Sequence, residues 1–201
     1  RPQHGNIPIY QMTWRQSRPL VHSLFTMEVG RRNPGDLVAD LFLMAGQQKA
    51  NPAAQVQLLE QCEEKLLRDD GVDDGERTVL LRDFARKIME MHRGGAREVK
   101  CFVVKFAEKI AKDYHEHLPD VLPSIHALAE DEDDSVQRSV LQAGVHLYRR
   151  TLAYIAEGLD SGAKVREVWD TLCKIKESMC EQLASPNDIL RIAAIKFVES
   201  V

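Results

Sequence analysis

The sequence predicts an all-α protein in which antiparallel helix pairs stack side by side as an α-solenoid. Apolar residues recur with the period of an amphipathic helix along most of the chain, and no segment alternates apolar and polar residues as a half-buried strand does. One helical pattern also returns, because residues 98–112, E-V-K-C-F-V-V-K-F-A-E-K-I-A-K, are matched by residues 189–199, I-L-R-I-A-A-I-K-F-V-E. Internal repetition of a helical unit is the sequence signature of a solenoid.

The two copies align residue by residue at an offset of 91 (190 − 99). The matched pairs are Val99 with Leu190, Lys100 with Arg191, Val104 with Ile195, Lys105 with Lys196, Phe106 with Phe197, and Glu108 with Glu199. A weaker copy, V-Q-R-S-V-L-Q-A-G-V, lies between them at residues 136–145. The spacings of 37 (136 − 99) and 54 (190 − 136) residues surround the length of one helix pair, which predicts stacked pairs.

Start and stop signals delimit the predicted helices along the chain. Asn33-Pro34 and Asn51-Pro52 each place a capping residue before a proline at the first helical position. The glycines at 94–95 separate two helices, and Pro123 predicts a short or kinked helix between residues 113 and 129. The first expected helix begins at residue 34. The next ones span residues 52–68, 76–92, 98–112, 135–156 and 163–184, and the last one follows the capping sequence Ser-Pro-Asn at residues 185–187.

The charge distribution divides the chain into two parts. Residues 1–33 hold five Arg and one Glu, a charge of +4, which leaves −8 for the rest of a chain whose net charge is −4. We expect an irregular basic arm at 1–33 and one helical-repeat domain at 34–201, together a fragment of a longer chain. An acidic body repels phosphate backbones, so direct nucleic-acid binding is not expected, although a helical-repeat RNA-binding module is the alternative interpretation.

No constellation of catalytic residues is visible in the sequence. There is no phosphate-cradling glycine loop, no G-x-S-x-G turn and no H-E-x-x-H pair, and His115 and His117 would lie on opposite sides of a helix. The four cysteines form no C-x-x-C pair, which favours reduced thiols in an intracellular compartment. No apolar run approaches the roughly 20 residues of a membrane span. We therefore expect a monomeric protein that is not an enzyme and needs neither metal nor cofactor.

A charged stripe that occurs in both strong copies is the candidate partner-binding surface. Lys100, Lys105 and Glu108 share one arc of their helix, and Arg191, Lys196 and Glu199 share the same arc of the last helix. An aliphatic residue, Val104 or Ile195, lies in the middle of each arc, and an apolar centre with a charged rim is typical of a protein contact. The candidate residues are Lys100, Val104, Lys105, Arg191, Ile195 and Lys196. The alternative is that Val104 and Ile195 pack against adjoining helices.

Several segments resemble the symplekin N-terminal domain family in wording and order. They include R-E-V-K-C-F-V-V-K-F-A-E-K-I-A-K, A-L-A-E-D-E-D-D-S-V-Q-R-S-V-L-Q-A-G-V-H-L-Y-R and N-D-I-L-R-I-A-A-I-K-F-V-E-S-V, and the resemblance covers residues 36–201. It implies a HEAT/armadillo-like domain of a nuclear scaffold for pre-mRNA 3′-end cleavage and polyadenylation. It also implies, as partners, a phosphatase that acts on the C-terminal domain of RNA polymerase II and other 3′-end processing factors, with Lys196 of the I-K-F-V-E motif placed to take part.

Overall fold

The computed structural model describes residues 33–68, 72–158 and 162–201. Across these ranges the chain forms eight α-helices and two short 3-10 segments, and no strand. In chain order they are α2 (Pro34–Gln47), α3 (Pro52–Leu67), α4 (Asp74–Glu90), α5 (Arg97–Asp113), η2 (His115–His117), α6 (Leu118–Ala129), α7 (Asp134–Glu157), α8 (Gly162–Glu181), η3 (Gln182–Ala184) and α9 (Asp188–Ser200). The prediction of an all-α fold is confirmed.

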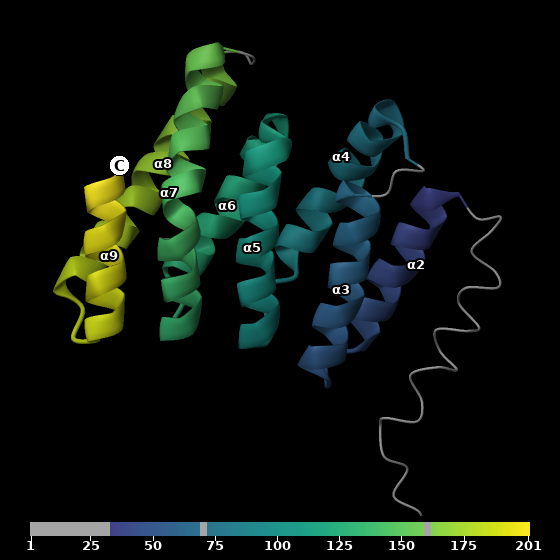
Figure 1. Cartoon of the computed structure of the whole chain (residues 1–201), viewed down its shortest axis with the longest axis horizontal. Helices are drawn as coiled ribbons and strands as arrows, with labels where there is room; N and C mark the ends of the chain where they lie inside the picture. Colours follow the sequence, from purple (N-terminus) through teal and green to yellow (C-terminus); the bar gives the residue numbers. More distant parts are fainter. Residues whose placement is uncertain (1–32, 69–71, 159–161) are drawn as a thin grey trace, which may run out of the picture.

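The helices are arranged in two layers (Figure 1). Helices α3, α5, α7 and α9 lie side by side in one layer, and in the second layer α6 contacts both α4 and α8. Helix α2 packs against α3 at one end of the stack, and α9 lies at the opposite end. Neighbours within a layer are therefore two helices apart in the chain, as expected for stacked helix pairs. None of the helices in the described ranges has the length and apolar character needed to span a bilayer.

The helix starts follow the capping signals of the sequence. The side chains of Asn33, Asn51 and Asn187 each accept a hydrogen bond from a backbone N–H two or three residues further on, at 2.9, 3.2 and 2.9 Å. Pro34 and Pro52 stand at the start of α2 and α3, where no intrahelical N–H bond is lost. These local contacts satisfy donors that the helix itself leaves unpaired, which explains why the starts could be predicted.

The segment between α5 and α7 is short and interrupted, as Pro123 predicted. One 3-10 turn, η2, precedes the 12-residue helix α6, and Pro123 lies inside α6. The apolar residues of α6 are nevertheless buried, including Leu122 and Ile125. Helix α6 contacts α4, α5, α7 and α8, so it lies in the interior of the second layer.

Helix α5 is the central element of the stack. It contacts α3, α4, α6 and α7, and Phe106 on its inner face is fully buried. The ring of Phe106 stacks on that of Phe102 one turn earlier, with 6.2 Å between the ring centroids. Because neighbouring helices surround α5 on three sides, a large share of its residues contributes to the core.

A glycine in α7 allows the last helix pair to approach closely. A Cβ atom added at Gly144 would lie 2.2 Å from Cε of Met179 in α8 and 3.4 Å from Cδ2 of Phe197 in α9. Phe197 also makes an edge-to-face contact with Tyr148 of α7, with 6.2 Å between the ring centroids. Because Gly144 has no side chain, α8 and α9 can pack closely against α7 at this position.

The predicted arm lies almost entirely outside the described residues. Of residues 1–33, the structure describes Asn33, which caps α2. The helices from α2 to α9 fall within the predicted domain at 34–201. The division of the chain at residue 33 stays a prediction.

Candidate partner-binding surface

The two strong copies of the repeat adopt the same orientation in their layer. Helices α5 and α9 lie on either side of α7, and both contact it. Phe106 and its counterpart Phe197 are both buried, at 0% and 2% exposure. Lys105 and its counterpart Lys196 are both exposed. The repeat seen in the sequence is therefore also a repeat of which residues face the core and which face solvent.

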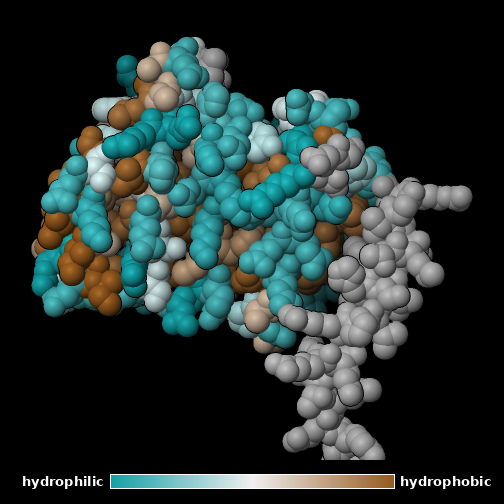
Figure 2. Space-filling view, in the orientation of Figure 1, coloured by the Kyte–Doolittle hydropathy of each residue, from teal (hydrophilic) through white to brown (hydrophobic). Residues whose placement is uncertain are grey.

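The aliphatic residues at the centre of the stripe differ between the two copies. Val104 is 1% exposed, whereas Ile195 is 45% exposed. Val104 does not lie on the surface as the stripe predicted, because α7 follows α5 in the layer and covers that side. The alternative interpretation, packing against the adjoining helix, holds for Val104. No described helix follows α9, so Ile195 faces solvent, and Figure 2 shows hydrophobic residues gathered over α9.

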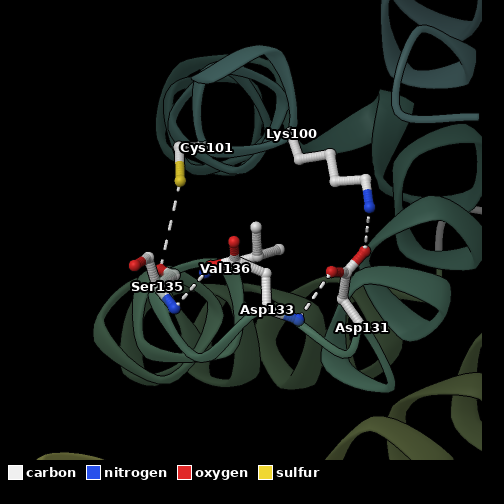
Figure 3. A network of polar contacts seen from close by, with 6 residues as sticks. All are labelled: Lys100, Cys101, Asp131, Asp133, Ser135 and Val136. Carbon is white, nitrogen blue, oxygen red and sulfur yellow. Dashed lines mark hydrogen bonds and ion pairs between the residues drawn. The ribbon is translucent and has the colours of Figure 1, made fainter. Parts of the chain in front are cut away.

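Lys100 connects α5 to the turn before α7 (Figure 3). Its ammonium group lies 2.6 Å from Oδ2 of Asp131, and the two side chains are only 24% and 12% exposed. The other carboxylate oxygen of Asp131 accepts a hydrogen bond from the backbone N–H of Asp133 at 3.0 Å. Lys100 is thus already engaged in an ion pair between elements, and its role in the structure is to hold α5 to the α6–α7 turn.

The same turn caps helix α7. Oδ1 of Asp133 accepts hydrogen bonds from the N–H groups of Ser135 at 2.8 Å and Val136 at 3.3 Å. Desolvation raises the pKa of the Asp133 carboxyl, but these donors outweigh it and hold the pKa below its ordinary value. The thiol of Cys101 on α5 lies 4.0 Å from the carbonyl oxygen of Ser135, and desolvation raises its pKa. Together these contacts close the seam between α5 and α7 at this end.

Arg191, the counterpart of Lys100, makes its contacts within its own turn. Its guanidinium donates to the carbonyl oxygen of Ser185 at 2.8 Å and pairs with the carboxylate of Asp188. Lys100 instead reaches forward to the turn before the next helix of its layer. The two cations of the stripe therefore occupy equivalent helix positions but stabilise different turns.

A groove between α7 and α9 lies beside Lys196, and we call it the α7–α9 groove. It has a volume of about 440 Å³. Its lining residues are Arg138, Leu141, Gln142, Val145, Ile189, Ile192, Ala193, Lys196, Phe197 and Ser200. Leu141 and Phe197 are almost fully buried, whereas Ile189 and Ile192 are 53% and 54% exposed. The groove thus has an apolar interior with exposed aliphatic side chains along α9.

Of the residues that line this groove, the charged stripe includes only Lys196. The charged stripe predicted a surface on α5 and α9, whereas four of the ten lining residues of the groove belong to α7. One signal was nevertheless present in the sequence: Ile189 and Ile192 align with Glu98 and Cys101 at the offset of 91. Two isoleucines therefore replace a charged and a small residue on the otherwise polar side of the repeat.

The fold and this surface define the class of protein: a helical-repeat module whose exposed apolar and charged residues suit it to binding another macromolecule. Residues 133–201 match the family model described as Symplekin/PTA1 N-terminal. Over these residues the match supports the resemblance to the symplekin N-terminal domain family seen in the sequence. It covers α7, α8 and α9, and so includes the α7–α9 groove. That family suggests a scaffold role, with protein partners, in mRNA 3′-end processing.

Proposed function

We propose that this domain docks a phosphatase that acts on the C-terminal domain of RNA polymerase II, and that Lys196 is a principal contact. The family match supports a scaffold role in mRNA 3′-end processing, and the resemblance of the I-K-F-V-E motif suggests the phosphatase as the partner. The observation that supports Lys196 most directly is its setting. It is exposed, it lines the α7–α9 groove, and it forms no ion pair or hydrogen bond with the described part of the chain.

An exposed lysine next to aliphatic side chains suits a protein contact for energetic reasons. The ammonium group can pair with a carboxylate of the partner, while burial of Ile192 and Ile195 removes apolar area from water. Both isoleucines are about half exposed in this structure, at 54% and 45%. We expect loss of the Lys196 ammonium to weaken binding by about 1 to 3 kcal/mol, the usual range for a charged hydrogen bond at an interface.

The other residues of the charged stripe have different parts in this proposal. Lys105 is exposed on α5 in the position equivalent to Lys196, so it extends the basic surface across α7. Ile195 supplies apolar area on the far side of α9. Lys100 and Arg191 are half-buried and paired, so they would support the surface mainly by holding the turns in place. Val104, which is buried, is not part of the proposed contact.

Calorimetric titration of the phosphatase against four proteins tests the proposal. These are the wild type, Lys196→Ala, Lys105→Ala and, as a matched control, Lys176→Ala, which removes an exposed lysine from α8 in the second layer. We expect Lys196→Ala to bind more weakly with an unchanged melting temperature, and Lys176→Ala to bind as the wild type does. Equal affinities for all four proteins would contradict the proposal. A parallel titration with single-stranded RNA tests the alternative of an RNA-binding module.

A further inference from the structure

The α7–α9 groove is tied at both ends and open in the middle. At one end the side-chain amide of Asn187 donates to Oδ2 of Asp134 at 2.6 Å, and at the other end Arg149 donates to the carbonyl oxygen of Ser200 at 2.5 Å. The separation of 13 positions (200 − 187) between these bridges corresponds to about 20 Å of helix. These two contacts hold α9 to α7 at both ends of the groove.

Polar contacts join the two helices at the preceding seam, between α5 and α7. There Cys101 contacts the carbonyl oxygen of Ser135, and the ring of His146 lies 3.9 Å from the carboxylate of Glu108. At the α7–α9 seam the α7 residue that corresponds to Cys101, at the offset of 37, is Arg138, and Ile192 of α9 is 54% exposed. Beside the α7–α9 seam, α9 thus exposes aliphatic side chains to solvent.

The charged residues that line the α7–α9 groove are both basic. Arg138 from α7 and Lys196 from α9 line it, and no acidic residue does. Neither cation forms an ion pair or hydrogen bond with the described residues, although many other cations of the chain do. Such pairs are Arg82–Asp83, Arg86–Glu90, Arg97–Glu98, Lys109–Glu63 and Arg191–Asp188. Two unpaired cations beside an apolar interior attract a segment with the opposite charge and an apolar anchor.

We infer that the α7–α9 groove takes a segment of the docked partner protein in which aliphatic side chains are flanked by carboxylates. The aliphatic side chains lie between Leu141 and Ile192, and the carboxylates pair with Arg138 and Lys196. This inference rests on the proposed function, since it specifies the chemistry of the partner at the same surface. It adds Arg138, Ile189 and Ile192 to the contact, three residues that the charged stripe did not include.

Matched pairs of variants test the groove against the rest of the surface. Ile192→Ser removes an aliphatic side chain from the groove, and Val198→Ser removes one from the opposite side of α9, where Val198 is 48% exposed. Arg138→Glu reverses a charge at the groove, and Arg166→Glu reverses one on α8, away from it. Titration with the phosphatase should show a loss of at least about tenfold for Ile192→Ser and Arg138→Glu, with their controls within about twofold of wild type.

A second measurement on the wild-type protein removes the dependence on well-folded variants. In methyl spectra of isoleucine-labelled protein, addition of the phosphatase should shift the signals of Ile189 and Ile192 and leave that of the buried Ile125 unchanged. Unshifted Ile189 and Ile192 signals in the presence of a bound phosphatase would overturn the inference.

The possible failures are distinguishable. If Lys196→Ala weakens binding but Ile192→Ser behaves like Val198→Ser, docking stands and the groove inference is wrong. If the phosphatase does not bind the wild type at all, both proposals are wrong. The inference is also overturned if light scattering shows a dimer that Ile192→Ser abolishes, because the occupant is then a second copy. Loss of single-stranded RNA binding in Arg138→Glu would likewise overturn it, with RNA as the occupant.

Discussion

Replacing Lys100 by methionine should lower the free energy of unfolding of the domain and leave the other residues of its surface unchanged. The substitution keeps an unbranched apolar stem and removes the ammonium group, which lies 2.6 Å from Asp131. The carboxylate of Asp131 would then keep the hydrogen bond from the backbone N–H of Asp133 but lose the ammonium group. The Asp131 side chain is only 12% exposed. A carboxylate that loses its counter-charge in such a site is left partly desolvated and unpaired.

The burial of this pair sets the size of the effect. Fully exposed ion pairs contribute about 0 to 1 kcal/mol, and breaking a fully buried one costs about 3 to 5 kcal/mol. Lys100 and Asp131 fall between these limits, with side chains 24% and 12% exposed. We therefore expect Lys100→Met to lower the free energy of unfolding by about 1 to 3 kcal/mol, the range for a hydrogen bond to a charged group.

Urea unfolding followed by circular dichroism measures this change. Lys105→Met is the matched control, since Lys105 is exposed on the same helix, and it should stay within about 0.5 kcal/mol of wild type. A double-mutant cycle with Asp131→Asn isolates the pair itself. Equal midpoints for Lys100→Met and Lys105→Met, or a coupling energy near zero, would refute the reasoning. Weaker partner binding by a Lys100 variant should therefore be compared with its stability before a direct contact is assigned.

Three further predictions concern the core, the α7 cap and a buried thiol. Phe106→Ala should lower the free energy of unfolding by about 3 to 5 kcal/mol in the same urea assay, and a change below about 1 kcal/mol would place Phe106 outside the core. The hydrogen bonds of the α7 cap lower the pKa of Asp133, so the cap stabilises the fold at neutral pH, and this stabilisation is lost as the pH falls through the folded-state pKa. The difference in free energy of unfolding between wild type and Asp133→Ala should therefore shrink below about pH 3.9. A difference that does not depend on pH would contradict this. Burial raises the pKa of Cys62 to about 12, so about one Cys62 thiol in ten thousand is ionised at pH 8. After treatment with maleimide, mass spectrometry should find Cys62 unmodified when the half-buried Cys173 has reacted.

Local signals in the sequence were sufficient for the helices but not for the groove. The Asn-Pro pairs place α2 and α3 because capping involves residues adjacent in the chain. Lys196 could be selected as a surface residue because helical periodicity places it about 100° around the helix from Phe197, which is buried. The groove could not be predicted in this way. It joins α9 to Arg138 and Leu141, which lie about 50 residues earlier in the chain, and no pattern within either helix specifies that pairing.

The sequence by itself determined that the chain is helical, that one helix recurs, and which family the repeated motif resembles. All three depend on residue types at short, regular spacing, and such spacing is set by the geometry of the helix alone. The tertiary structure decided which residues of the repeat are available to a partner. Val104 and Ile195 occupy the same position in two matching helices, yet one is 1% and the other 45% exposed. The difference arises because burial depends on which helix packs against each side, and α7 covers Val104 while no described helix covers Ile195.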